Sequence, residues 1–329
     1  MRTAIHWTPA RLLRTHDVAR DIRLFEIAPE GGARTNAPGS HINVALVIND
    51  QADSRSYSIV DSSLEAYRIA VKRCAPSRGG SQAMWRLPPG APLTISEPHN
   101  HFALDFDRTD YLLVAGGIGV TPLMGMAAAL ARTGKAYRFV HVAPTRTEAA
   151  FVQELRDAHQ ARYEPRYSRE GATLDLALEI ARLAPQGQLY FCGPMRLLQA
   201  ARAAWSAAGR HAADLRFETF ASGGRYAAEA FTVKIPRAGL EVRVGETETM
   251  LAALARAGVD IMSDCQRGEC GLCAVDVLGC EGTIDHRDVF FSEREHAQNA
   301  KMCACVSRAL GGGVSIDTAF RSTASLLDA

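Results

Sequence analysis

The sequence predicts a multidomain chain: an antiparallel β-barrel, an α/β domain built on a parallel sheet, and a smaller α+β domain. Three observations predict this order. Short β-rich runs fill the first part of the chain, strands and helices alternate through the middle, and a hairpin and a helix precede a cysteine-rich loop near the end. A chain of 329 residues is also too long for a single core. We expect domains at residues 1–108, 109–228 and 229–329.

The first domain is predicted to be all-β. Strand-like runs cover residues 22–27, 42–48 and 67–71, and they are separated by turns rich in Gly, Pro, Asn and Asp. Short strands at this spacing favour a closed barrel.

The second domain changes character at an apolar strand, residues 111–115. Alternating strands and helices predict a parallel sheet with helices on its faces. The remaining elements expected here are helices at 121–133, 149–161, 174–183 and 195–208, and strands at 137–142, 188–191 and 214–220. Residues 221–230 are small and polar, as in a linker.

The third domain is predicted to open with a hairpin. Its strands are expected at residues 231–236 and 240–244, followed by a helix at 249–257 and the cysteine loop.

Composition and charge exclude several classes of protein. The hydrophobic content of 47% and the charged content of 22% are ordinary for a soluble protein, and the net charge of +1 gives no bulk attraction to nucleic acid or a membrane. No apolar run is long enough for a transmembrane helix, and the N-terminus lacks the apolar stretch of a signal peptide. Clustered cysteines without a secretion signal favour metal or redox chemistry over disulfides. We therefore expect a cytoplasmic protein.

The cysteine loop is the most specific motif. Cys265, Cys270 and Cys273 are spaced C-x4-C-x2-C, which is typical of a plant-type [2Fe–2S] cluster. Gly268 and Gly271 allow the backbone to curl so that amides point at cluster sulfurs. A zinc site or free thiols are the alternatives, but zinc sites prefer paired C-x2-C knuckles.

The fourth thiolate is not decided by spacing alone. Cys303 and Cys305 both lie about thirty residues beyond the loop, and Cys280 is a third candidate.

The segment Arg55-Ser56-Tyr57-Ser58 has the composition of a flavin contact. A tyrosine ring can stack on the isoalloxazine, a serine can hydrogen-bond its edge, and an arginine can hold phosphate as a fork. A surface arginine and a strand tyrosine are the alternative.

A second segment offers phosphate ligands. A Gly-Gly-Ser turn at a helix start presents amides and a hydroxyl. The residues concerned are Val71, Lys72 and Arg73, followed by Arg78, Gly79, Gly80 and Ser81.

Two turns follow apolar strands in the α/β domain. Gly116, Gly117 and Gly119 lead into Thr121-Pro122, and glycines at a strand–helix junction let a pyrophosphate approach the backbone. This is not the usual G-x-G-x-x-G, no acidic residue stands obviously where a ribose needs one, and a tight packing turn is the alternative. The second turn is Cys192-Gly-Pro194, where Cys192 is either a core thiol or a nicotinamide contact.

In this order, the motifs resemble the phthalate dioxygenase reductase family, which includes vanillate O-demethylase reductases. Two further segments, Asp285-His-Arg-Asp288 and Cys305-Val-Ser-Arg-Ala309, support the resemblance, which covers nearly the whole chain. It implies an FMN-binding barrel, an NAD-binding α/β domain and a β-grasp, ferredoxin-like α+β domain.

The resemblance also implies site residues. Cys305 heads the C-V-S-R-A motif and would be the fourth iron ligand, although counting C-x29-C from Cys273 lands on Cys303. Thr121, Cys192 and Glu218 would lie at the reacting centre. The implied flavin and nucleotide ligands are Arg55, Ser56, Tyr57, Ser58, Val71, Lys72, Gly79, Gly80, Ser81, Gly116, Gly117, Thr121 and Cys192.

The implied activity is that of a reductase for a Rieske-type oxygenase. NADH supplies two electrons, the cluster accepts one at a time, and FMN between them handles both. We expect a monomer whose partners are NADH and the oxygenase. Other hypotheses are a reductase for a different acceptor such as a cytochrome P450, and a redox-sensing protein without turnover. Arg146 could meet the 2′-phosphate of NADPH, although a surface arginine is commoner.

Overall fold

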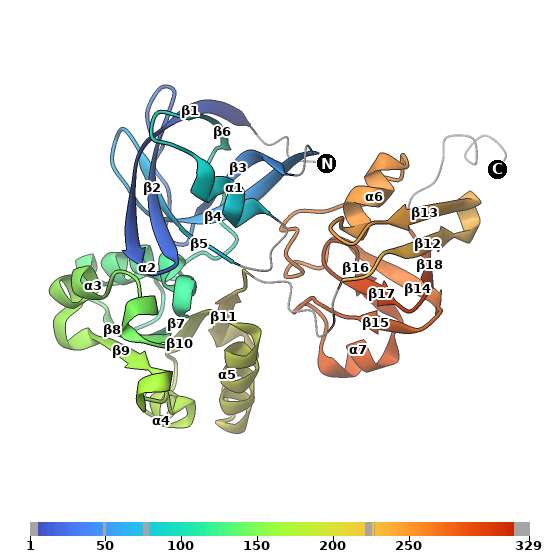
Figure 1. The fold of residues 1–329 in the computed structure, drawn as a ribbon. Helices are drawn as coiled ribbons and strands as arrows, with labels where there is room; N and C mark the ends of the chain where they lie inside the picture. The colour runs from blue at the N-terminus through green and yellow to red at the C-terminus, as the bar shows by residue number, and fades with distance from the viewer. Residues whose placement is uncertain (1–5, 49–50, 75–78, 221–225, 227, 319–329) are drawn as a thin grey trace. The chain divides into compact units, whose positions relative to one another are not determined.

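The computed structural model describes residues 6–48, 51–74, 79–220, 226 and 228–318 (Figure 1). The described residues form two compact units that meet in the sequence between Glu218 and Thr219. We call them the N-terminal unit and the C-terminal unit. Arg78 and most of the expected linker, residues 221–225 and 227, lie outside the described residues. The three domain boundaries stay a prediction.

The first part of the N-terminal unit is an antiparallel barrel, as predicted. Its strands close in the order β1-β2-β5-β4-β3-β6, and the expected runs fall in β2, β3 and β5. Side chains that alternate along the strands, such as Phe25 and Ile27 of β2, are fully buried inside it. The elements are β1 (Trp7–Ala19), β2 (Ile22–Pro29), β3 (His41–Ile48), β4 (Gln51–Ser62), β5 (Tyr67–Lys72), α1 (Gly80–Arg86) and β6 (Pro92–Ser96).

The second part is a five-stranded parallel sheet in the order β11-β10-β7-β8-β9. Its central strands are continuous apolar runs because helices cover them. The elements are β7 (Asp110–Gly116), α2 (Val120–Arg132), β8 (Ala136–Ala143), α3 (Val152–His159), β9 (Tyr163–Tyr167), α4 (Leu176–Ala181), β10 (Gln188–Cys192), α5 (Met195–Ala207) and β11 (Leu215–Glu218).

Two strands and one helix of this second part differ from expectation. β9 is an unexpected strand: it contains Pro165, which argues against a strand, but β9 is an edge strand, where a missing amide is tolerated. α3 is shorter than expected because Phe151 and Gln160, at its two ends, have positive φ angles of 61° and 50°. β11 ends at Glu218, before Phe220.

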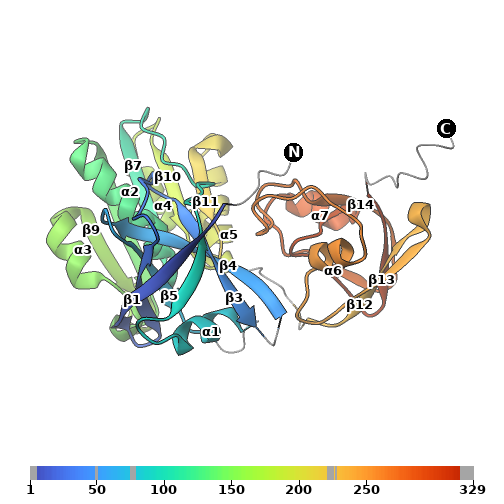
Figure 2. The same ribbon diagram turned by 90° about the horizontal axis from the view of Figure 1, so that it is seen from above.

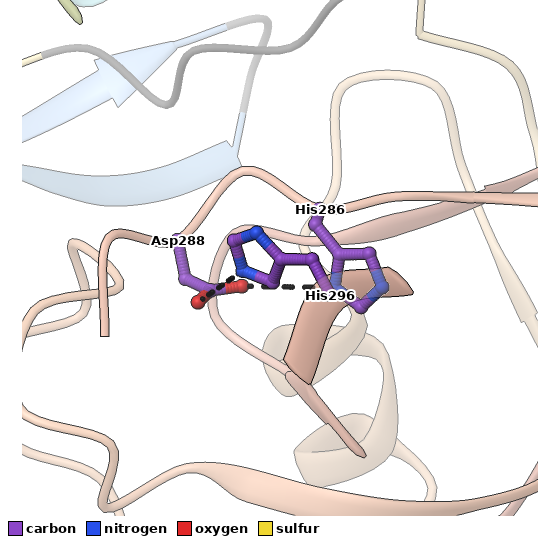
Figure 3. Close-up of side chains that lie close together, drawn as sticks. All are labelled: His286, Asp288 and His296. Atoms are coloured by element: carbon purple, nitrogen blue, oxygen red, sulfur yellow. Dashed lines mark hydrogen bonds and ion pairs between the residues drawn. The ribbon is translucent and has the colours of Figure 1, made fainter. Parts of the chain in front are cut away.

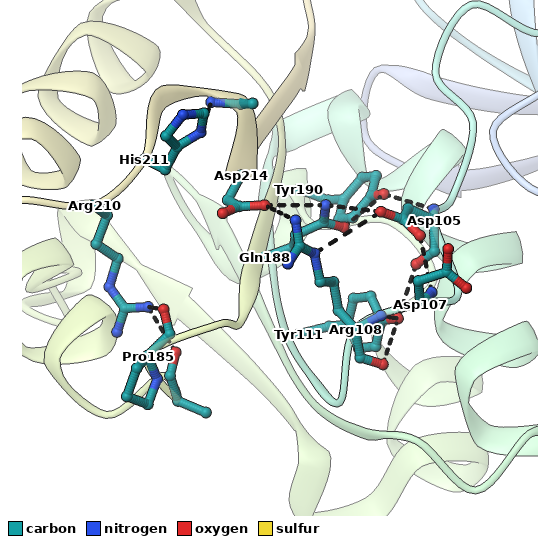
Figure 4. A network of polar contacts seen from close by, with 12 residues as sticks. Asp105, Asp107, Arg108, Tyr111, Pro185, Gln188, Tyr190, Arg210, His211 and Asp214 are labelled. Atoms are coloured by element: carbon teal, nitrogen blue, oxygen red, sulfur yellow. Dashed lines mark hydrogen bonds and ion pairs between the residues drawn. The ribbon is translucent and has the colours of Figure 1, made fainter.

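Tyrosine hydroxyls anchor the connection from the barrel to the sheet (Figure 4). The Tyr111 hydroxyl donates to the Asp105 carbonyl at 2.8 Å, and the Tyr190 hydroxyl accepts from the Asp105 amide at 2.8 Å. Arg108 pairs with Asp214 at 2.7 Å. The parallel sheet also meets the barrel through α2, which packs against β4 of the barrel and against β7 and β8 of the sheet. Barrel and sheet are thus tied at several points within one unit.

The C-terminal unit has the predicted β-grasp arrangement. Its five-stranded sheet runs β13-β12-β18-β14-β16, with β12 and β18 parallel, and α6 packs against β13 (Figure 2). Its elements are β12 (Phe231–Ile235), β13 (Leu240–Val244), α6 (Met250–Arg256), β14 (Ala274–Cys280), β15 (Thr283–Asp285), α7 (Glu293–Gln298), β16 (Lys301–Cys303), β17 (Arg308–Leu310) and β18 (Gly313–Asp317). No helix among the described residues has the length and apolarity needed to cross a membrane.

Candidate functional site

The cysteine loop curls around the sulfur of Cys265. The backbone amides of Arg267, Glu269 and Cys270 each lie 3.4 Å from Cys265 Sγ. The loop needs glycine at Gly268, whose φ is 76°, since an added Cβ would lie 2.8 Å from Asp288 Cα. Burial raises the pKa of Cys265, and these amides oppose that shift because they stabilise the thiolate, the form that binds iron.

Cys273 is in contact with Cys303 and Cys305, the two candidates for the fourth iron ligand. The thiols of Cys303 and Cys305 donate to its sulfur, and these hydrogen bonds lower the pKa of Cys273 to about 3. Cys280 is elsewhere, at the far end of β14 and about 20 Å along the strand from Ala274.

Cys303 and Cys305 differ in what surrounds them. The pKa of Cys305 is raised by its hydrogen bond to Cys273 and by burial, with further contributions from the charges of Cys273 and Cys265; the Gly268 amide opposes them. The pKa of Cys303 is raised by its hydrogen bond to Cys273, by burial and by the charge of Asp288. The charge of Cys265 thus contributes to the raised pKa of Cys305, and the charge of Asp288 to that of Cys303.

The buried carboxylate of Asp288 lies next to the cysteine loop. Asp288 accepts from the Ser307 hydroxyl at 3.1 Å and from the Phe291 amide at 3.0 Å. The amide of the next residue, Val289, donates to the Gly268 carbonyl at 2.9 Å. The two motifs singled out in the sequence, at 285–288 and 305–309, thus meet at Asp288 and Ser307.

The arginine of the second motif, Arg308, has a structural role. Arg308 is buried and donates to the carbonyls of Glu248 at 2.7 Å, Gly245 at 2.6 Å and Glu229 at 2.9 Å. It therefore joins the segment before β12 to the loop before α6. This role was not predicted from the sequence, although the motif marked the residue.

Glu269, inside the cysteine loop, fixes the start of the C-terminal unit. The amide and the hydroxyl of Thr219 donate to Glu269 Oε1 at 2.6 and 3.1 Å. The residue that follows β11 in the chain is therefore hydrogen-bonded to the cysteine loop.

In the barrel, Arg55 of β4 lies directly over the Gly-Gly-Ser turn. A Cβ added at Gly80 would be 2.7 Å from Arg55 Nε, so the arginine side chain lies close against this glycine. Gly79 has a φ of 90°. The Ser81 hydroxyl accepts from the Cys74 amide at 3.2 Å. Arg55 and Gly80, which are far apart in sequence, therefore lie next to each other, and Ser81 follows Gly80 in α1.

The neighbouring end of β5 packs against α1. The Val71 carbonyl accepts from Trp85 Nε1 at 3.1 Å, and Lys72 Nζ pairs with Asp21 at 3.3 Å. The guanidinium groups of Arg23 and Arg73 stack on the Trp85 ring. Val71 and Lys72 are thus held by contacts within the protein.

Ser58 joins the barrel to the sheet. Its hydroxyl lies 3.4 Å from Glu218 Oε2, and both side chains are buried. Two residues earlier in β4, the exposed Ser56 donates to Asn43 at 2.6 Å. Between them, burial raises the pKa of Tyr57, which stays neutral at ordinary pH. Arg55 pairs with Asp53, so each residue of the Arg-Ser-Tyr-Ser segment is held by a side-chain partner or by burial.

The two glycine turns meet at the carboxyl edge of the sheet. β7 and β10 are neighbours, and the chain runs outward from them to β8–β9 on one side and β11 on the other, so this is the point where the strand order reverses. An added Cβ at Gly116 would be 2.4 Å from Pro194, and one at Gly119 would be 2.1 Å from the Cys192 carbonyl. By contrast, a Cβ added at Gly117, whose φ is 55°, would have no described atom within 4 Å.

Cys192 and Thr121 are buried beside these turns. Cys192 pairs in register with Ala115 of β7 and with Glu218 of β11. The Thr121 hydroxyl donates to the Ile118 carbonyl at 3.0 Å, which closes the turn that begins α2. Cys192 and Glu218 therefore lie next to each other at the sheet edge.

A residue that sequence reasoning missed supports the same turn. His141 of β8 is fully buried; its Nε2 lies 3.1 Å from the Gly117 carbonyl and its Nδ1 lies 3.0 Å from the Tyr163 hydroxyl. Because Nε2–H donates to a carbonyl, Nδ1 accepts from Tyr163. Burial lowers the pKa of His141 to about 4, so it is neutral. A histidine within the apolar second half of β8 was the available signal.

The residues present fit the groups that the resemblance implies. Soft thiol donors converge on one loop, as iron–sulfur ligation requires. At the sheet edge, Gly117 leaves backbone open where a Cβ would meet nothing, and the adjacent glycines allow no side chain. Such a backbone surface is suited to a pyrophosphate.

Comparison with known proteins agrees with this arrangement. The family described as the 2Fe-2S iron-sulfur cluster binding domain matches residues 233–310. The chain is 37% identical over 319 residues to the phenoxybenzoate dioxygenase subunit beta of Ectopseudomonas oleovorans, which covers 93% of this chain and 96% of that protein.

Two solved structures are similar over nearly the whole chain. Phthalate dioxygenase reductase, described as a modular structure for electron transfer from pyridine nucleotides to [2Fe–2S], has a TM-score of 0.77 and 27% identity, over 94% of this chain and 98% of that one. An intact type IV self-sufficient cytochrome P450 monooxygenase has a TM-score of 0.68 and 33% identity over 94% of this chain, which spans 41% of that longer one. The chain therefore belongs to the phthalate dioxygenase reductase family and is an oxidoreductase that uses a flavin, NADH and a [2Fe–2S] cluster.

Proposed function

We propose that this chain is the NADH-dependent reductase component of a Rieske-type oxygenase, and that it passes electrons from NADH through FMN and the [2Fe–2S] cluster to the oxygenase one at a time. One observation carries the proposal: a single chain combines a converging set of loop thiols with a glycine-lined sheet edge. The first suits a one-electron centre and the second suits a dinucleotide.

In this proposal the flavin is FMN and lies against the barrel. Arg55 and Ser81 hold its phosphate beside Gly79 and Gly80, with Lys72 and Val71 bordering the ring. The contact of Arg55 with Gly80 supports the phosphate assignment, because it brings a guanidinium and a hydroxyl-bearing turn together. Tyr57, with Ser56 and Ser58 on either side, faces the ring; a neutral phenol stacks without bringing a charge.

The nicotinamide nucleotide lies at the sheet edge. Gly116 and Gly117 give the pyrophosphate access to the backbone, and Thr121 holds the turn. Cys192 and Glu218 border the nicotinamide. The Ser58–Glu218 contact supports this assignment, because it connects the flavin-side strand β4 with the sheet edge. The flavin accepts the electron pair of the nucleotide and releases single electrons.

The iron ligands in this proposal are Cys265, Cys270, Cys273 and Cys305. Plant-type clusters have potentials near roughly −400 mV and Rieske centres lie at about −150 to +300 mV, so transfer onward is downhill.

NADH rather than NADPH is supported by the partner of Arg146. Its guanidinium and its amide both bind Glu170, at 2.8 and 2.9 Å, and it stacks on Tyr167. The Glu170 carboxylate, which Arg146 holds with both its side chain and its amide, leaves a negative charge that would repel a 2′-phosphate beside this arginine. The ratio of kcat/KM for the two nucleotides measures this preference, which Glu170→Gln should shift toward NADPH.

The acceptor is identified by reconstitution. Purified holoprotein is mixed with NADH and a candidate Rieske oxygenase, such as one encoded beside this chain, and NADH consumption is measured together with product. Coupled turnover that depends on the oxygenase supports the proposal. Fast reduction of ferricyanide without transfer to any Rieske protein contradicts it.

A cytochrome P450 is the second candidate acceptor. It is favoured by the 33% identity to a self-sufficient cytochrome P450 monooxygenase, of which this chain spans 41%. The same assay with a haem partner separates the two, since only the true acceptor accelerates NADH consumption at equal concentration. We also propose that the chain is a monomer, which light scattering of the holoprotein tests.

A further inference from the structure

Three side chains of the C-terminal unit, outside the cysteine set, have the chemistry of a metal site. His286, Asp288 and His296 each offer one ligand atom, and these atoms lie within 4.8 Å of one another (Figure 3). We propose that they bind a divalent first-row transition cation of the Zn²⁺ type. This site is separate from the proposed electron pathway and does not depend on it.

The cluster is tight and largely shielded from water. His296 Nε2 lies 2.9 Å from Asp288 Oδ2, and His286 Nδ1 lies 3.9 Å from Asp288 Oδ1. The two imidazole rings stack with their centroids 4.4 Å apart. The Asp288 side chain is fully buried and the His286 side chain is only 8% exposed.

His286 Nδ1 is the atom that points to a ligand. It is buried and has no hydrogen-bond partner among the residues that the structure describes. On the opposite side of the ring, Nε2 lies 2.8 Å from Asn299 Oδ1. An amide oxygen only accepts, so Nε2 carries the proton and Nδ1 keeps its lone pair. That lone pair faces a carboxylate, an arrangement that a cation between them would stabilise.

Asn299 also has the position of an outer-shell partner. Metal-binding histidines commonly donate their second N–H to an oxygen, which fixes the tautomer and the ring. Asn299 ends α7 with a φ of 49°, so the helix end places this oxygen. The histidine is therefore already oriented for binding through Nδ1.

The carboxylate lacks a permanent cation. Asp288 is hydrogen-bonded to Ser307, Phe291 and His296, but none of the described lysines and arginines forms an ion pair with it. Arg287, next to it in sequence, turns to Asp285 instead, at 2.7 Å. A divalent cation would supply the missing positive charge, and each carboxylate oxygen has lone pairs beyond those in use.

Two imidazoles and one carboxylate match the preferences of Zn²⁺. Catalytic zinc sites use three such ligands at about 2.0–2.2 Å and leave a fourth position to water. Binding requires two changes. His296 must lose the proton that lies between its Nε2 and Asp288, and the His286 and His296 rings must turn so that both direct a nitrogen at the cation. Because His296 lies on α7 and His286 and Asp288 lie before it, the cation would crosslink this segment. That segment backs the cysteine loop through Asp288 and Gly268.

The test is a Zn²⁺ titration of the holoprotein with its flavin and cluster in place. Bound zinc is measured by competition with a fluorescent chelator, and iron content and visible absorption are followed to show that zinc does not displace iron. Cys74 is exposed, so the titration is run in a Cys74→Ser background. We expect saturable binding of one Zn²⁺ per chain and a rise in the thermal midpoint of the protein.

Variants locate the site. His296→Ala and His286→Ala should each weaken binding about tenfold or more, since each removes a ligand. His16→Ala removes an exposed imidazole of β1 and should change nothing. An intact cluster spectrum in each variant shows that it is folded, and His296→Asn replaces His296→Ala if that variant loses its cluster. Absence of saturable binding, or equal affinity in all variants, overturns the proposal.

Discussion

Cys303 and Cys305 are two residues apart, yet their neighbours differ. β16 ends at Cys303, which pairs with Ala274 across the sheet, and the charge of Asp288 contributes to its raised pKa. Cys305 lies beyond the strand and faces Cys273, Cys265 and the Gly268 amide. Spacing alone favoured Cys303 and the motif favoured Cys305; the surroundings support the motif.

Replacing Cys305 by serine should therefore abolish the cluster. We expect loss of iron and of the iron–sulfur absorption, with flavin content and NADH–ferricyanide activity retained, because the residues proposed to bind the flavin and NADH lie in the N-terminal unit. Cys303→Ser is the matched control and should keep its iron. If Cys303→Ser loses the cluster and Cys305→Ser retains it, the ligand assignment is wrong.

His141 should make the stability of the N-terminal unit depend on pH. Its pKa is lowered to about 4 in the folded chain, below the ordinary value of 6.5. Between these values the unfolded chain binds the proton and the folded one does not, so stability is full above about pH 6.5 and falls as the pH drops. From about pH 7.5 to about pH 5 the loss is about 2 kcal/mol.

Denaturant unfolding of His141→Gln and the native chain across this pH range measures the effect. The variant lacks the titrating group, so its stability should fall less on acidification by about that amount. Parallel stability curves for the two proteins would show that His141 does not contribute.

At the scale of elements, the turn between β7 and α2 depends on backbone-to-backbone packing. The start of α2 touches the end of β10 at Gly119, where a Cβ would lie 2.1 Å from the Cys192 carbonyl. A side chain there must push β10 away, which moves Cys192 and the following turn. The same helix tolerates a Cβ at Gly125, where the nearest atoms are at 3.8 Å.

Two alanine substitutions in this region should therefore have opposite effects. Gly119→Ala should destabilise the N-terminal unit by about 1–3 kcal/mol and lower kcat/KM for NADH about tenfold or more, with flavin retained. Gly125→Ala should stabilise α2 by about 1 kcal/mol and leave kinetics unchanged. Steady-state kinetics and unfolding curves measure both, and a harmless Gly119→Ala would contradict the packing argument.

Elements with a strong local pattern were predictable and those decided by context were not. The apolar runs of β7 and β10 and the alanine-rich α2 appear where expected, because burial on both faces leaves a continuous apolar signal. β9 was missed because Pro165 argues against a strand, and only its edge position permits it. Thiol spacing revealed the loop, but the links made by Asp288, Arg308 and His141 join distant segments that no local pattern connects.

At the scale of the whole molecule, the N-terminal unit brings two sets of residues together from different folds. The barrel supplies Ser58 and the parallel sheet supplies Glu218, and their contact is buried. Glu218 is also the last residue of that unit, and Thr219, the next residue, binds the cysteine loop through Glu269. The boundary between the two units therefore falls between two neighbouring residues, each of which is hydrogen-bonded within its own unit.

Glu218→Gln should slow NADH-driven flavin reduction about tenfold or more, because the contact with Ser58 loses a charge-assisted hydrogen bond at the sheet edge. Stopped-flow absorbance measures the rate. Asp214→Asn, on the same side of the sheet but at its amino end, is the control and should leave this rate near that of the native chain. Unchanged reduction in Glu218→Gln would remove Glu218 from the proposed site.

The central claim is that one polypeptide carries electrons from NADH through its flavin to its own iron–sulfur cluster. The most direct measurement is EPR of the anaerobic holoprotein after addition of NADH alone, with Cys305→Ser as the control. A rhombic signal with a mean g value below that of the free electron is expected in the native chain and not in the variant. If NADH bleaches the flavin but no such signal appears in the native chain, even after dithionite, the account is contradicted.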